Sequence, residues 1–284
     1  MAVDPDAVVL TAPLSRRPSS APRLLVLAPA LVVLLLTVGC IVAPQWIAPS
    51  DPIVGDTAIK LSAPTSLHPF GTDFLGRDLL SRVVYGAAPS VLASTAAVVL
   101  ALAIGAPLGM CAALVPRSDG ALMRMIDIVL ALPGLLLALA LVALLGFSIE
   151  NAAIAVGIGL MPYVARLVRT ETQRVRSAEF VEVAISGGVG GIALVVRHII
   201  PNIAGTIAAY AVLQIGHAIL SIATLGFLGF GAQPPWPEWG LLIAEGRDYL
   251  ASAWWLTTFP GIVVIVVVVS LSAVSRELSK GTRA

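Results

Sequence analysis

Six long apolar runs are the feature that most limits what this chain can fold into. Each is about 17–27 residues long, and about 20 helical residues cross the hydrocarbon core of a bilayer. Backbone groups in lipid need hydrogen-bond partners within the chain, so we expect every run to form a helix. The alternating pattern of a membrane barrel is absent. The runs are 24–43, 89–115, 126–147, 152–168, 203–228 and 254–274.

The scarcity of charge agrees with a membrane protein. Hydrophobic residues make up 58% of the chain and charged residues 12%, whereas a soluble domain carries about 25% charged residues. Lipid must therefore be the solvent for much of the surface. A net charge of +1 without a basic stripe argues against a nucleic-acid partner. The two cysteines, Cys40 and Cys111, lie in apolar runs, so we expect neither a disulfide nor a metal site.

Lysine and arginine predict the orientation of the six helices. With the N-terminus in the cytoplasm, thirteen of these residues are cytoplasmic and four external, which is a clear positive-inside bias. Both termini are then cytoplasmic. Cys40 and the arginines before it also weakly suggest a lipoprotein signal, but the apolar stretch is long and five more runs follow, which favours an uncleaved first helix. The four external residues are Lys60, Arg77, Arg82 and Arg247.

The chain carries no visible energy source for transport. The interiors of the apolar runs hold no Asp, Glu, Lys or Arg, and His217 is the only ionisable side chain deep in a run apart from cysteine. No Walker A sequence occurs. Three classes stay open: a passive channel, a membrane enzyme, or the membrane half of a pump driven by another chain. The histidines His68, His198 and His217 fall in three different compartments, so no catalytic cluster is visible.

The longest cytoplasmic connection, 169–201, favours the pump. It contains a short helical pattern with Glu182 near its start, where a carboxylate suits the helix dipole. Gly188 then permits a sharp turn and the close approach of another chain. The segment therefore fits a docking site for a soluble partner. A helix lying in the lipid headgroups fits the pattern equally well.

At this segment the sequence resembles a known family. Glu182, Ala184, Gly188 and Pro201 match, in register, the EAA motif of bacterial importer permeases, with Val183 in place of the second alanine. In that family the loop forms a coupling helix that docks on the ATPase subunit. The resemblance implies the same ATPase-docking role for these four residues.

The resemblance extends over about residues 68–240. His68 to Asp73, with Gly76 to Asp78, resembles the signature that precedes the second helix in dipeptide and oligopeptide permeases. Further similar stretches are Ala131-Leu132-Pro133, Tyr163 to Arg169, Phe227-Leu228-Gly229 and Gln233-Pro234-Pro235. Together they resemble the C-type permease subunit of an ATP-driven peptide importer. Nickel and glutathione importers share the signatures, so these solutes are the alternative.

The family implies an all-α membrane protein with a type I importer permease core in the bacterial cytoplasmic (inner) membrane. It also implies a second permease subunit, two ATPase subunits that hydrolyse ATP, and an external solute-binding protein. No cofactor and no catalytic residue are expected in this chain. The expected organisation is a disordered cytoplasmic tail 1–23, a first helix 24–43, an external loop 44–88 and a core 89–280 with a coupling loop 170–200.

Two further groups of residues are candidate functional sites. Tyr210, Gln214, His217 and Ser221 share one stripe of the fifth predicted helix, where they line the translocation path or bond this helix to a neighbour. Asp73, Arg77 and Asp78 precede the second predicted helix, where they fix the loop or contact the binding protein. We also expect Thr72 or Asp73 to cap a short helix there. Trp236, Trp239, Trp254 and Trp255 are interpreted as an external aromatic belt.

Overall fold

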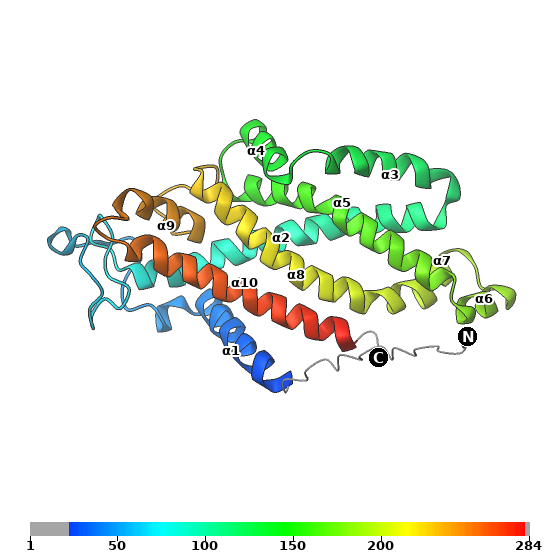
Figure 1. The fold of residues 1–284 in the computed structure, drawn as a ribbon, viewed down its shortest axis with the longest axis horizontal. Coiled ribbons are helices and arrows are strands. Elements are labelled where there is room, and N and C mark those ends of the chain that lie inside the picture. The colour runs from blue at the N-terminus through cyan, green and yellow to red at the C-terminus, as the bar shows by residue number, and fades with distance from the viewer. Residues whose placement is uncertain (1–22, 282–284) are drawn as a thin grey trace, which may run out of the picture.

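The protein is an elongated bundle of long helices, seen in a computed structural model that describes residues 23–281 (Figure 1). Most of the predicted tail 1–23 lies outside the described residues. Within them the chain forms no strand, only one isolated bridge between Thr72 and Asp78. The long helices are α1 (Arg23–Val42), α2 (Leu79–Leu114), α5 (Ile149–Arg176), α8 (Ile200–Phe227) and α10 (Trp255–Gly281).

Four helical stretches within residues 23–281 are long and apolar enough to cross a membrane: α2, α5, α10, and the stretch Gly191–Phe227 that ends in α8. The pair α3 (Pro116–Leu130) and α4 (Gly134–Leu145) makes a fifth span if it is counted as one. In α1 the apolar part, Leu27–Val42, is shorter. The protein is therefore a multi-pass membrane protein. Six spans and cytoplasmic termini stay predictions.

The predicted span 126–147 is not one straight helix. Its two halves, α3 and α4, meet at an angle of 86°. The chain breaks at Pro133, which lacks an amide hydrogen and disfavours helical geometry at Leu132 before it. Gly134 follows directly and begins α4. Lipid would penalise the freed backbone groups, so such a break is tolerated only beside other protein or a cavity.

Glycines bring the backbones of α2 and α5 close together at three points. A Cβ atom added to Gly109 would lie 2.3 Å from the carbonyl oxygen of Ala165, and one added to Gly105 would lie 2.7 Å from that of Met161. Gly157 makes the matching approach from α5, at 2.8 Å from the carbonyl oxygen of Ala97. The Gly105–Gly109 pair thus serves helix packing inside this chain. We call this contact the α2–α5 seam.

A cap of loop and short helices covers one end of the bundle (Figure 1), and the arginine count predicts that this end is external. We call it the external cap. The predicted short helix at Asp73 is wrong, because Gly71 and Gly76 adopt φ angles of +75° and +77° and the chain turns there. Helix α2 instead begins at Leu79, with Asp78 as its N-cap. The expected external loop 44–88 thus already includes the first helical residues of α2. The other cap elements are the 3-10 turns Pro44–Trp46, Thr57–Ile59 and Arg247–Tyr249, and helix α9 (Trp239–Gly246).

The aromatic-belt prediction is half wrong. Trp236 and Trp254 are 64% and 51% exposed, as a belt requires. Trp239 and Trp255 are buried in the apolar core that joins α2, α9 and α10. Each finds a partner for its indole N–H, Trp239 at the Val83 carbonyl and Trp255 at the Thr72 carbonyl. A satisfied N–H removes the usual reason for a tryptophan to stay at the interface.

Candidate functional site: a cavity beside α8 and the α6 loop

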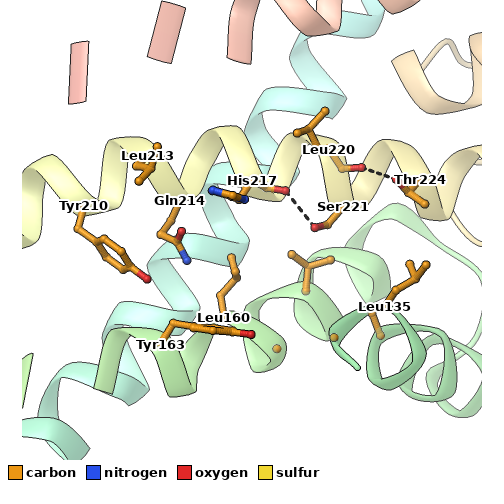
Figure 2. A pocket seen from close by; sticks show the side chains of 14 residues that line it. Leu135, Leu160, Tyr163, Tyr210, Leu213, Gln214, His217, Leu220, Ser221 and Thr224 are labelled. Atoms are coloured by element: carbon orange, nitrogen blue, oxygen red, sulfur yellow. Dashed lines mark hydrogen bonds between the residues drawn. The ribbon is translucent and has the colours of Figure 1, made fainter. Parts of the chain in front are cut away.

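The predicted stripe of α8 lines a cavity. Tyr210, Gln214, His217 and Ser221 all border a space of about 610 Å³ between α8 on one side and α4 and α5 on the other (Figure 2). Sequence reasoning missed two polar members of the lining, Thr224 and Tyr163. Thr224 lies one turn beyond Ser221 on α8. Tyr163 lies in a stretch of α5 noted only for its family likeness, and only the fold brings it opposite α8.

The hydroxyl groups of the stripe bond to their own helix. Ser221 Oγ donates to the His217 carbonyl at 3.0 Å, and Thr224 Oγ1 donates to the Leu220 carbonyl at 2.7 Å. Within residues 23–281, the side chains of Tyr210, Gln214 and His217 make no hydrogen bond to another helix. The stripe therefore supplies polar groups to the cavity rather than bonds between helices of this chain.

The loop that we predict to be cytoplasmic forms three short helical segments at the end of the bundle opposite the external cap (Figure 1). They are α6 (Glu179–Ser186), α7 (Gly191–Leu194) and a π-helical turn, Val195–Ile199, that runs directly into α8. Pro201 lies just beyond that turn, at the second position of α8. Its missing amide hydrogen cannot bond the carbonyl four residues back, which accounts for the widened turn.

Helix α6 carries several exposed apolar residues. Val181 is fully buried against the bundle, whereas Phe180, Val183 and Ile185 are 48%, 72% and 47% exposed. Glu182 lies in the first turn of α6 and faces solvent, and Ala184 is half-buried. Single exposed apolar residues are ordinary, but three on one eight-residue helix mark an interaction surface.

Gly188 ends α6 in the way its sequence position predicts. Its φ angle is +88°, a conformation that strongly favours glycine. Its amide donates to the Ile185 carbonyl at 2.9 Å, and the amide of Val189 donates to the Ala184 carbonyl at 3.0 Å. A Cβ at Gly188 would meet nothing within 4 Å, so the glycine is required here by backbone geometry and not by contacts within this chain.

The external residues Asp73 and Arg77 are buried and paired. Each is 3% exposed, and Arg77 Nε donates to Asp73 Oδ2 at 2.6 Å. Two residues not singled out from the sequence complete the network, Arg82 and Glu245 of α9. Arg82 is fully buried, and its Nη2 lies 2.9 Å from Glu245 Oε2. The one sequence feature that could have indicated Arg82 as a member is its position one helical turn after Asp78. Burial favours the loop-fixing interpretation over contact of these side chains with another protein.

The remaining external candidate, Asp78, is also an internal partner. Its carboxylate accepts from the amide and the hydroxyl of Ser81, at 2.7 and 2.8 Å, and lies 2.9 Å from His68 Nδ1. A second buried carboxylate, Glu238, caps α9 by accepting from the amides of Gly240 and Leu241, both at 2.9 Å. Burial raises the pKa of Glu238, and these hydrogen bonds oppose the rise.

Three arginines of α5 bind α3 and the last residues of α2. Arg169 donates two hydrogen bonds of 2.7 Å to the carboxylate of Asp119 on α3. Arg166 forms an ion pair with Asp127, which also lies on α3. Arg176 donates to the last carbonyls of α2, at 3.2 and 3.3 Å. These contacts join α5 to α2 and α3 at the end from which α6 continues. No group of three metal-ligating side chains occurs within residues 23–281.

Comparison with known proteins gives one consistent family. Residues 105–284 match the family described as binding-protein-dependent transport system inner membrane component. The di/tripeptide transport system permease protein DppC of Pseudomonas aeruginosa is 39% identical over 85% of this chain and 82% of that protein. The probable D,D-dipeptide transport system permease protein DdpC of Escherichia coli is 40% identical over 86% and 82%, respectively.

Two further matches widen the comparison. A glutathione transport system permease protein, GsiD of Escherichia coli, is 40% identical over 86% of this chain and 80% of that protein. Among solved structures, a chain of the MetNI methionine ABC transporter in an inward-facing conformation matches with a TM-score of 0.61. At 13% identity, over 72% of this chain and 97% of that one, this match establishes the fold alone.

Proposed function

The chain belongs to the binding-protein-dependent transport system inner membrane component family, and we propose that it forms one side of a path for dipeptides and oligopeptides across the bacterial cytoplasmic membrane. It is a permease of an ATP-driven importer with the type I permease fold. Such permeases work with separate ATPase subunits, so this chain is not an enzyme.

The cavity carries the proposal. Its walls, α4, α5 and α8, belong to this chain, and the space between them is only partly enclosed. A second permease subunit would close it. Peptides differ in their side chains but share a neutral polar backbone, which suits the hydroxyl, amide and imidazole groups of the α8 stripe. The names of the peptide-transporting relatives support the same substrate class.

The other partners are assigned to the two ends of the bundle. One of two ATPase subunits docks on the exposed apolar residues of α6. Glu182, Ala184 and Gly188 lie beside these residues, and Pro201 lies at the start of α8. The external cap faces a solute-binding protein. There Asp73, Arg77 and Asp78 hold the cap in shape, and its exposed residues make the contact.

A second substrate has a specific observation in its favour. The GsiD relative is named as a glutathione permease and is as similar to this chain as the dipeptide permeases are. Glutathione is itself a tripeptide, so the same neutral path serves it. Nickel or another small solute is a weaker alternative, since His217 is the one imidazole that the cavity lining offers.

The path is tested by labelling with a water-soluble thiol reagent in the assembled transporter. Cysteines replacing Gln214, His217 and Ser221 should react, whereas one replacing Ile215 should be protected, because Ile215 packs in the apolar core. Uptake of a labelled dipeptide, with and without ATP depletion, is measured in the same cells. Protection of all four positions, or uptake that ignores ATP depletion, would contradict the proposal.

The docking site has its own test, with a matched control on the same helical turn. Glu182→Lys should abolish peptide uptake while the protein stays in the membrane, because it reverses the charge on the surface proposed to face the ATPase. Glu179→Lys changes the charge of α6 equally but lies outside the motif, and it should retain uptake. Equal uptake by the two variants, with normal co-purification of the ATPase, would rule out the assigned role.

A further inference from the structure

Gln214 is the most buried of the polar side chains that border the cavity. Only 6% of the residue is exposed, yet its amide has no hydrogen-bond partner within residues 23–281. Figure 2 shows the amide pointing from α8 across the cavity toward α5. The amide is not one of the fully buried, unpartnered groups of the described residues, so its donor and acceptor reach the cavity space. A ligand in the cavity that supplies both a donor and an acceptor would satisfy it.

The facing wall offers one polar side chain. Among the cavity residues contributed by α4 and α5, only Tyr163 carries a polar group, and it is 49% exposed. Tyr163 and Tyr210 lie on opposite walls beside Gln214 (Figure 2). Within the described residues, neither phenol hydroxyl has a hydrogen-bond partner. Two phenols and a primary amide thus meet in one section of the path, and all three have free hydrogen-bonding capacity.

We propose that Gln214, Tyr163 and Tyr210 form a transient binding site for the peptide bond itself. A glutamine amide presents a C=O acceptor beside N–H donors, and a peptide bond presents the complementary N–H and C=O groups. The two phenols donate to, or accept from, the neighbouring backbone groups. This inference rests on the proposed function and adds to it the chemical group that the path recognises.

The rest of the cavity makes room for varied side chains. Gly134 and Gly159 border the same space, and a Cβ added to either would meet nothing within 4 Å. The other α4 and α5 members are Leu135, Ala138, Val156 and Leu160. Such walls place little demand on the shape of a peptide side chain. The combination favours selection by backbone chemistry, which is common to all peptides, and tolerance of sequence.

The experiment compares two substrates in the assembled transporter. One is an unmodified alanine dipeptide, and the other is its analogue in which an ester replaces the peptide bond and removes the N–H donor. The ratio of amide uptake to ester uptake is measured for the wild type and for Gln214→Leu and Tyr163→Phe. The binding protein is the same throughout, so a change in this ratio reports the permease. Membrane levels are followed by immunoblot.

We expect Gln214→Leu to lower the amide-to-ester ratio about fivefold to tenfold, since a hydrogen bond in a site of this kind contributes about 1 kcal/mol and 1.4 kcal/mol is a factor of ten. Tyr163→Phe should lower it by a smaller factor. The matched controls are Gln45→Leu in the external cap and Tyr85→Phe on α2, neither of which borders the cavity. Both controls should leave the ratio unchanged.

The outcomes separate this inference from the function on which it rests. If the wild type takes up the dipeptide and the ratio is the same in every variant, the peptide-bond site is wrong and the importer assignment stands. If the wild type takes up neither substrate, the peptide function itself fails. A loss of total uptake at an unchanged ratio marks a structural role for Gln214 and also overturns the inference.

Discussion

Replacing Arg82 by methionine tests how much the external cap depends on its buried charges. Arg82 is fully buried, 2.9 Å from Glu245 and 3.7 Å from Asp73. Arg77 lies 2.6 Å from Asp73 and 3.7 Å from Glu245, so two cations face two carboxylates. Arg82→Met leaves one carboxylate charge unmatched. Removing one partner of a buried ion pair costs about 3–5 kcal/mol.

Thermal unfolding of the purified protein in detergent measures this cost. At roughly 2 °C per kcal/mol for a chain of this size, Arg82→Met should lower the midpoint by about 6–10 °C. Arg247→Met is the matched control in the same cap, because Arg247 is exposed and pairs with exposed Asp248 at 3.2 Å. Its loss should cost under about 1 kcal/mol.

The penalty should also depend on pH with a defined sign. Burial raises the pKa of Glu245, while Arg82 and Arg77 hold it down, so removing Arg82 raises it further. A carboxyl group whose pKa is raised by folding favours the folded state at low pH, and this stabilisation is lost as the pH rises through the folded-state pKa. The deficit of Arg82→Met should therefore be smaller at pH 5 than at pH 8. Equal deficits at both pH values, or equal shifts for Arg82→Met and Arg247→Met, would refute the reasoning.

Three further predictions follow from other parts of the bundle. A cysteine at Thr57 should react with an impermeant thiol reagent outside the cell, and one at Ser118 should not; the reverse labelling would overturn the orientation. Gly109→Val should lower the free energy of unfolding by about 1–3 kcal/mol, because its Cβ would lie 2.3 Å from the Ala165 carbonyl oxygen. Gly120→Ala should raise it by about 0.5–1 kcal/mol, because its Cβ would meet nothing within 4 Å. Thermal unfolding measures both variants. Because folding raises the pKa of Glu238, wild-type stability should fall as the pH rises above the ordinary carboxyl range, and Glu238→Gln should show less of this fall between pH 5 and pH 8.

The sequence predicted the helical class and the polar stripe because both depend on local periodicity. Apolar runs of bilayer length specify helices whatever their neighbours are. The stripe from Tyr210 to Ser221 follows from helical spacing alone, and all four of its members border the cavity. Gly188 was also predictable, since a glycine between helical segments marks a turn.

The parts that failed depend on contacts between distant segments. Whether Trp239 is an interface residue or a core residue is decided by the Val83 carbonyl, which lies 156 positions away. The pairing of Arg82 with Glu245 likewise spans 163 positions. Tyr163 joined the candidate site only when the fold placed α5 opposite α8. Proline signalled the break at Pro133, but its angle of 86° depends on the tertiary structure around it.

The α2–α5 seam gives the transporter a stiff mechanical linkage. At the three glycines no side chain separates the backbones of α2 and α5, so no side chain there can rearrange when one helix moves. We therefore expect α2 and α5 to shift together. Helix α6 follows α5 after two residues, Ser177 and Ala178. Tyr163 lies on α5, about 20 Å from its last residue, Arg176, at 1.5 Å per residue. If the proposed ATPase subunit tilts α6, we therefore expect α5 and α2 to move together and to shift the α5 wall of the cavity.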